Sequence, residues 1–124
     1  MKKRYIIEFG TGADLHGGNQ TKAAIRAIQD ATSRSCLCGL EEVLQGDPLQ
    51  MHVHAKIGCT DPDSIDKEAV LSAIPVGTGE IEVVPGGLCV PGLSVPEFGQ
   101  GDTIQIVIAA LTVWAEVDSR ASDD

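Results

Sequence analysis

The chain has 124 residues and a mass of 13.0 kDa, which predicts a single domain. Hydrophobic residues make up 43% of the sequence and charged residues 22%, a balance typical of a globular protein. Acidic residues outnumber basic ones by 18 to 9, which gives a net charge of −9. This balance argues against nucleic-acid binding and against an anionic membrane surface, because both need Lys and Arg.

The sequence carries no segment typical of membrane insertion or secretion. No apolar run reaches the roughly 18 residues of a membrane helix, and the apolar stretch after the basic opening is too short for a signal peptide. We therefore expect a cytoplasmic protein, and we expect no membrane or nucleic-acid partner. In a reducing compartment the four cysteines do not imply disulfides.

The first half of the chain predicts a strand, a glycine-rich loop and a helix. Residues 5–9 are β-branched or aromatic enough for a strand, and residues 10–19 contain four glycines. The helix begins near Gln20, with Asn19 as its cap, and ends around residues 34–36. Its alanine-rich face is narrow, which lets the helix lie close to a sheet. A second, short helical turn is predicted at residues 40–44.

The second half predicts three strands and one short helix. Residues 51–57 alternate with period two, so Met51 faces one way and His52 the other. Asp66 caps a helix over residues 67–74, which Pro75 ends. Residues 80–84 form the third strand, residues 85–96 a Gly/Pro-rich crossing, and residues 103–117 a last strand that is apolar on both faces.

This order predicts an α+β fold in residues 1–117, followed by an acidic C-terminal tail at residues 118–124. We expect a single-layer, four-stranded mixed sheet with two main helices on one face, in the order β-α-β-α-β-β. Two helices cannot cover both faces of such a sheet. The other face should therefore be buried in a homo-oligomer that packs sheet faces together.

Three stretches of the chain resemble a family of conserved hypothetical proteins. The motif Gly-Thr-Gly-Ala-Asp-Leu-His-Gly at residues 10–17, with Thr-Lys-Ala-Ala at residues 21–24, resembles the opening of that family. Residues 66–75 and 83–88 look like it too, so the resemblance spans nearly the whole chain. The family carries no assigned activity, and the resemblance therefore implies no reaction.

The element order is also similar to the Bacillus-type chorismate mutase fold. That similarity implies a trimer with sites between subunits, so a trimer is the first expectation for the homo-oligomer. No matching catalytic motif is present, and mutase chemistry relies on arginine cations, of which the chain has four. We do not predict a mutase, because fold does not imply function.

The glycine-rich segment at the start of the first helix is the strongest candidate site. Backbone N–H groups of Gly10, Gly12 and Gly17, with the positive end of the helix, suit a carboxylate or phosphate. Thr21 and Lys22 would hold the anion as well. Asp14 and His16 could act as an acid–base pair in catalysis. The alternative is a glycine-rich turn that Asp14 stabilises as an acceptor.

Four other groups of residues have weaker patterns. His52 and His54 could bind Zn²⁺ with a third ligand, although a solvated or interface face with Lys56 is favoured. The cysteines Cys36, Cys38, Cys59 and Cys89 lack the usual zinc spacing and read as small apolar residues. The carboxylates Asp61, Asp63 and Asp66 precede a helix, as capping alone would select. Residues 85–88 could approach a ligand or serve as a rigid crossing.

Two functions from different classes are compatible with these patterns. The first is an oligomeric enzyme or ligand-processing protein for a small anionic metabolite, with its site at Gly10–Lys22 near a subunit interface. The second is a non-catalytic oligomeric module that binds a ligand or a partner protein. The sequence contains no cofactor-binding loop and no closed metal-ligand set, so it implies no cofactor and does not decide whether the chain is an enzyme.

Overall fold

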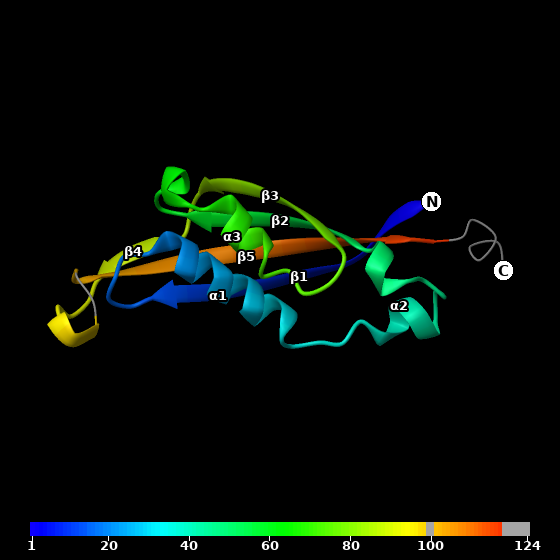
Figure 1. Ribbon diagram of the computed structural model, residues 1–124, viewed down its shortest axis with the longest axis horizontal. Helices are drawn as coiled ribbons and strands as arrows, with labels where there is room; N and C mark the ends of the chain where they lie inside the picture. The colour runs from blue at the N-terminus through cyan, green and yellow to red at the C-terminus, as the bar shows by residue number, and fades with distance from the viewer. Residues whose placement is uncertain (99–100, 118–124) are drawn as a thin grey trace.

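A mixed five-stranded sheet carries the helices on one of its faces (Figure 1). The computed structural model describes residues 1–98 and 101–117, so the predicted tail at 118–124 lies outside the described residues. The strands are β1 (Lys2–Asp14), β2 (His52–Cys59), β3 (Thr78–Pro85), β4 (Leu88–Pro91) and β5 (Thr103–Glu116). The helices are α1 (Gln20–Thr32), α2 (Cys38–Glu42) and α3 (Lys67–Leu71). The predicted α+β class with a mixed sheet is confirmed.

The strand order is β1-β5-β2-β3, and β4 pairs with β5 beyond the end of β2. Strand β5 is antiparallel to β1, β2 and β4, whereas β2 and β3 are parallel. The sheet has one strand more than predicted, because residues 88–91 of the predicted Gly/Pro crossing form β4. Two prolines of that crossing fit at the end of β3 and at the end of a short strand, where a missing N–H is tolerated.

The core lies between the sheet and its helices. Alternate residues of β2 and β5 point toward α1 and α3, as the period-two pattern predicts. Helix α1 contributes small side chains to this core. The buried core residues of α1, β2 and β5 are Ala23, Ala24, Ala27, Ile28, Ala31, Val53, Ala55, Ile57, Cys59, Val107, Ala109, Leu111, Val113 and Ala115.

Strand β1 is longer than predicted, because residues 10–14 continue it instead of forming a loop. Gly10 and Gly12 lie directly under α1. A Cβ atom at Gly10 would overlap the backbone of Ala27 and Ala31, and one at Gly12 would overlap the backbone of Ala23 and Ala27. The helix therefore lies closer to β1 than a side chain at either position would allow.

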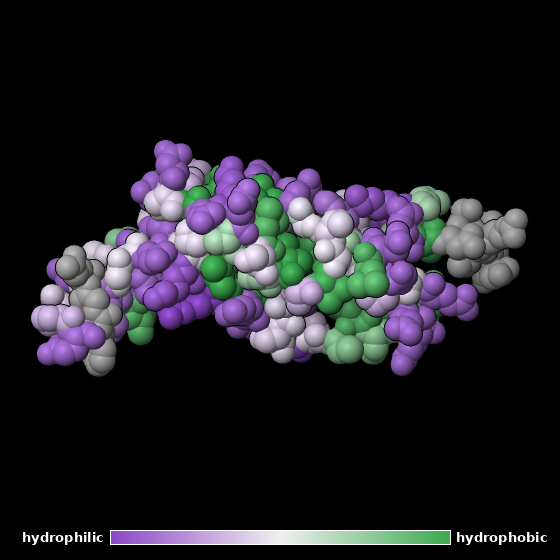
Figure 2. All heavy atoms as spheres, viewed as in Figure 1, coloured by the Kyte–Doolittle hydropathy of each residue, from purple (hydrophilic) through white to green (hydrophobic). Residues whose placement is uncertain are grey.

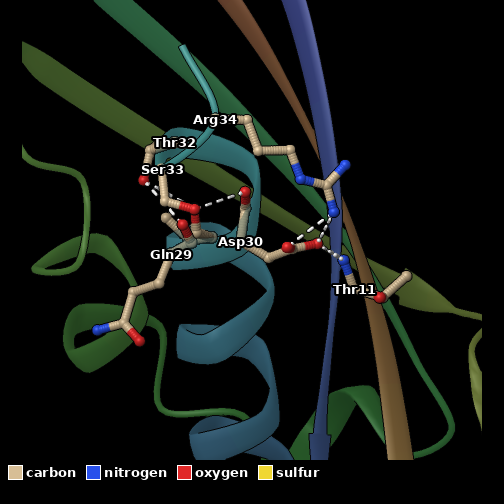
Figure 3. Close-up of polar contacts among 7 residues, drawn as sticks. Thr11, Gln29, Asp30, Thr32, Ser33 and Arg34 are labelled. Carbon is tan, nitrogen blue, oxygen red and sulfur yellow. Dashed lines mark hydrogen bonds and ion pairs between the residues drawn. The ribbon is translucent and has the colours of Figure 1, made fainter. Parts of the chain in front are cut away.

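The outer edge of β1 is tied to α1 by two side chains of the helix. The carboxylate of Asp30 accepts a hydrogen bond from the backbone N–H of Thr11 at 2.9 Å and also pairs with Arg34 (Figure 3). Arg26 donates to the carbonyl of Ala13 at 2.6 Å. These contacts satisfy edge groups that no strand pairs, which makes this part of the edge a poor template for another chain.

Helix α1 does not reach along the whole sheet. A helix of 13 residues is roughly 20 Å long, whereas a strand of 14 residues extends roughly 46 Å. Helices α1 and α3 cover one end and the middle of the sheet, and α2 lies at the other end, near the start of β1 and the end of β5 (Figure 1). Along one part of the covered face, α1 and α3 pack directly on the sheet. Along the rest, α2 and the segment around it cover the sheet.

We expect Gly12→Ala to lower the free energy of unfolding by about 2 kcal/mol or more, because the new methyl group can only fit if α1 moves away from β1. Urea denaturation measures this. Gly58→Ala is the matched control, since a Cβ there would make only ordinary contacts, the nearest at 3.6 Å. We expect this control to stay within about 1 kcal/mol of the wild type. Equal effects of the two substitutions would contradict the close packing.

The Asp30 contacts also predict a pH dependence. The hydrogen bond from Thr11 and the pairing with Arg34 lower the pKa of Asp30 below its ordinary value. The stabilisation is therefore present above the unfolded-state pKa and is lost as the pH falls through the lowered folded-state pKa. We expect Asp30→Asn to be less stable than the wild type at pH 7, with the difference shrinking below about pH 4. Denaturation curves at several pH values test this, and an equal difference at pH 7 and pH 3 would refute it.

Candidate functional site

The sequence predicts an acid–base and anion site at Gly10–Lys22, and residues 14–22 of this segment form the helix-start corner. In the structure the Asp14 carboxylate is only 6% exposed. Its Oδ2 accepts hydrogen bonds from the backbone N–H groups of Asn19 at 2.8 Å and Gly17 at 3.2 Å. Its Oδ1 lies 3.8 Å from the guanidinium of Arg26. Asp14 thus closes the turn between β1 and α1, as the alternative reading of the sequence describes.

The other residues predicted for this corner also make contacts within the protein. The Thr21 hydroxyl accepts a hydrogen bond from the backbone N–H of Asp66 at 2.9 Å, which joins α1 to the start of α3. The N–H of Lys22 donates to the Asn19 side chain at 3.0 Å, so the predicted cap is confirmed, and the Lys22 side chain is exposed. His16 is half-buried, with its carbonyl close to Gly101.

The predicted anion site has fewer free donors than the sequence suggests. The backbone N–H of Gly17, one of its predicted donors, already donates to Asp14. Gly10 and Gly12 lie in β1 under the helix, where their lack of a side chain permits close packing. The structure brings Asp14, Gly17 and Lys22 to one corner, but it gives the first two a role in the turn itself.

A partly buried polar cluster, which the sequence did not predict, lies beside this corner. The Gln20 side-chain N–H₂ donates to Thr60 at 2.9 Å and to Gln105 at 2.8 Å, and the Thr60 hydroxyl donates to the same Gln105 oxygen at 2.8 Å. The Gln105 N–H₂ in turn donates to the sulfur of Cys89 at 3.1 Å. Through side-chain hydrogen bonds, the cluster joins α1, the residue after β2, β4 and β5.

One atom of this cluster stands out. The Oε1 atom of Gln20 is buried and accepts no hydrogen bond among the described residues. The sequence does indicate that Gln105 is unusual. It takes an inward position of β5, and the other buried inward positions of this strand hold valine, alanine or leucine. Gln20 has no such signal, because a polar residue at the start of a helix is ordinarily solvated.

A concave region, the α2 cavity, lies over the end of the covered face away from this corner. It has a volume of about 420 Å³ and is walled by the end of α1, the segment around α2 and the segment that follows α3. Its floor is apolar, with Val53 from β2 and Leu111 and Val113 from β5. Figure 2 shows apolar residues gathered over the sheet between α1, α3 and α2.

The weaker patterns have structural explanations. His52 contacts the Thr78 hydroxyl at 3.0 Å, and His54 lies 3.0 Å from Glu80 and 3.2 Å from Glu82. Among residues 1–98 and 101–117, no group of three His, Cys, Asp or Glu side chains is placed to hold a metal ion.

The predicted cap at Asp66 is confirmed, because its side chain accepts from Ala69 N–H at 3.2 Å. All four cysteines are free. Cys59 is buried, and this burial raises the pKa of its thiol. In the described part of the chain, no helix has the length and apolar character that crossing a membrane requires.

Comparisons with known proteins agree with the fold. A family model described as "conserved hypothetical protein (Lin0512_fam)" matches residues 4–113. A search of curated proteins found no match. Among solved structures, the chain is similar to an FtsZ-like protein of unknown function from Nostoc punctiforme PCC 73102. The two sequences are 37% identical, the similarity covers 93% of this chain and 97% of that one, and the TM-score is 0.84.

We expect Asp14→Ala to lower the free energy of unfolding by about 2 kcal/mol, because two backbone donors in a tight turn lose their acceptor. Urea denaturation measures the loss. Asp63→Ala, which removes an exposed carboxylate elsewhere, is the control, and we expect it to stay within about 0.5 kcal/mol of the wild type. Unchanged stability of Asp14→Ala would contradict a structural role for this carboxylate and would favour a role in ligand binding or catalysis.

Proposed function

Since the chain belongs to the Lin0512 family of conserved hypothetical proteins, whose description names no activity, we propose its function from its geometry: a non-catalytic module that assembles with copies of itself through the open face of its sheet. The solved relative, described as FtsZ-like and of unknown function, adds no activity to this proposal. The observation that carries it is the uncovered, partly apolar sheet face opposite α1 and α3.

The open face has an apolar half built on β1, β4 and β5. The strand register places Phe9 beside Ala110, Thr11 beside Ile108, and Leu88 beside Ile106. Large side chains remain exposed there, namely Phe9 at 69%, Leu88 at 60%, Ile7 at 52% and Ile108 at 48%. Contiguous apolar patches larger than a few hundred Å² are rare on soluble monomers, and they mark interaction surfaces.

The other half of the open face is polar, with a lysine and two carboxylates among its side chains. His52, His54 and Lys56 form a row on β2, and Glu80 and Glu82 form a parallel row on β3. A second copy packed on this face can place the row of β2 opposite the row of β3, which supports self-association over binding of a partner with one sign of charge. An apolar centre beside a polar margin is also the usual anatomy of a protein interface.

The helix-start corner favours a non-catalytic module over an acid–base enzyme. A general base must be free to take a proton from a substrate within hydrogen-bond reach. The Asp14 carboxylate instead holds the turn through two backbone donors and lies close to Arg26. The trimer expected from the fold analogy is one form that the assembly would take.

We expect the wild-type chain to be an oligomer over a wide range of concentration and Phe9→Glu to be a monomer, because the substitution places a charge at the centre of the apolar half. Light scattering after size-exclusion chromatography measures the mass directly. Leu49→Glu makes the same change at a side chain that is 73% exposed but lies outside the sheet, so it should keep the wild-type mass. A monomeric wild type, or dissociation by both variants, would overturn the proposal.

A further inference from the structure

The α2 cavity, on the covered side of the sheet, is independent of the open face. It exists because α1 is too short to cover the whole sheet, so that α2 and its flanking segments roof the remainder at a distance. A volume of about 420 Å³ is ample for a small organic molecule. The floor and much of the wall are aliphatic, with Leu40, Val53 and Leu111 buried in the core around it.

One wall residue has a charge where the fold predicts an apolar side chain. Glu8 pairs in register with Leu111 and belongs to the same inward row of β1 as Gly10 and Gly12. It lines the cavity and is half-buried, and its Oε2 accepts a hydrogen bond from the Ser35 hydroxyl at 2.8 Å. A carboxylate held at the side of an apolar cavity is costly unless a positive group or further donors face it.

The charge of the cavity has one sign. Glu41 and Glu42 of α2 join Glu8 in its lining, and the described residues that line it include no Lys, Arg or His. Three carboxylates around an apolar floor attract cations and repel anions, and the low-polarity walls strengthen this preference. A ligand that fits must therefore combine an apolar body with a positive group that donates hydrogen bonds.

We propose that the α2 cavity binds a small organic cation, a protonated amine on a compact hydrocarbon body, with the ammonium group at Glu8 and the body on the floor made by Val53, Leu111 and Val113. The amine donates to the Glu8 carboxylate, which is an acceptor with two oxygens, one of them already bonded to Ser35. The hydrocarbon body displaces water from apolar walls, which supplies the rest of the affinity.

The test compares a cation and an anion of the same shape. Calorimetric titration with adamantylmethylammonium and with adamantane carboxylate gives two dissociation constants, and we expect the ammonium compound to bind at least about tenfold more tightly. Octylammonium, a linear probe, covers the case in which the cavity rejects a cage. Amide shifts in NMR spectra should fall on Val53 and Leu111. Failure of both ammonium probes to bind, or equal binding of the carboxylate, would overturn the proposal.

Matched variants identify the group responsible. Glu8→Gln keeps the size of the side chain and its acceptor for Ser35 but removes the charge, so it should abolish most of the preference for the cation. Glu80→Gln removes an equal charge from the open face and should leave both constants unchanged. A wild-type preference in Glu8→Gln would contradict the assignment. If the wild-type chain is a monomer and still binds the cation, the proposed self-assembly is refuted and the proposed cation site is not.

Discussion

The close approach of α1 to β1 is the constraint on which the rest of the architecture depends. Two glycines in β1 and an alanine-rich face on α1 bring helix and strand backbones together with almost no side chain between them. At this separation Asp30 and Arg26 can reach the free edge of β1 and bond to its backbone. The same packing fixes the start of α1, so Asp14 lies where it can close the turn that precedes the helix.

A single sheet with helices on one side leaves two very different surfaces. The covered face is buried by small side chains from α1, whereas the open face exposes large apolar ones such as Phe9 and Ile108. Large contiguous apolar patches on a soluble protein mark interaction surfaces. The inward apolar residues of β5 pack against the helices of the protomer, and the proposed self-assembly would account for the apolar residues on its outward face.

The sequence predicts those features that depend on neighbours along the chain. The period-two pattern around His52 and His54, the caps at Asn19 and Asp66, and the alanine face of α1 all act locally, and the structure confirms them. Strand β4 could not be predicted, because its proline and glycine neighbours favour turns and only its pairing with β5 makes it a strand. The cluster around Gln20 and Gln105 joins residues 85 positions apart, and no pattern of neighbouring residues predicts such a contact.

The placement of the chain's few cations explains why the α2 cavity is lined by negative charge. The chain has twice as many acidic as basic residues, and the structure places two of its arginines, Arg26 and Arg34, where they hold the edge of β1 and the end of α1. Lys56 lies 3.9 Å from Glu82 on the open face. None of these three cations lines the α2 cavity. The carboxylates of Glu8, Glu41 and Glu42 therefore give the cavity a negative electrostatic potential. A short helix on a long sheet creates the space, and an acidic composition decides which ligands can enter it.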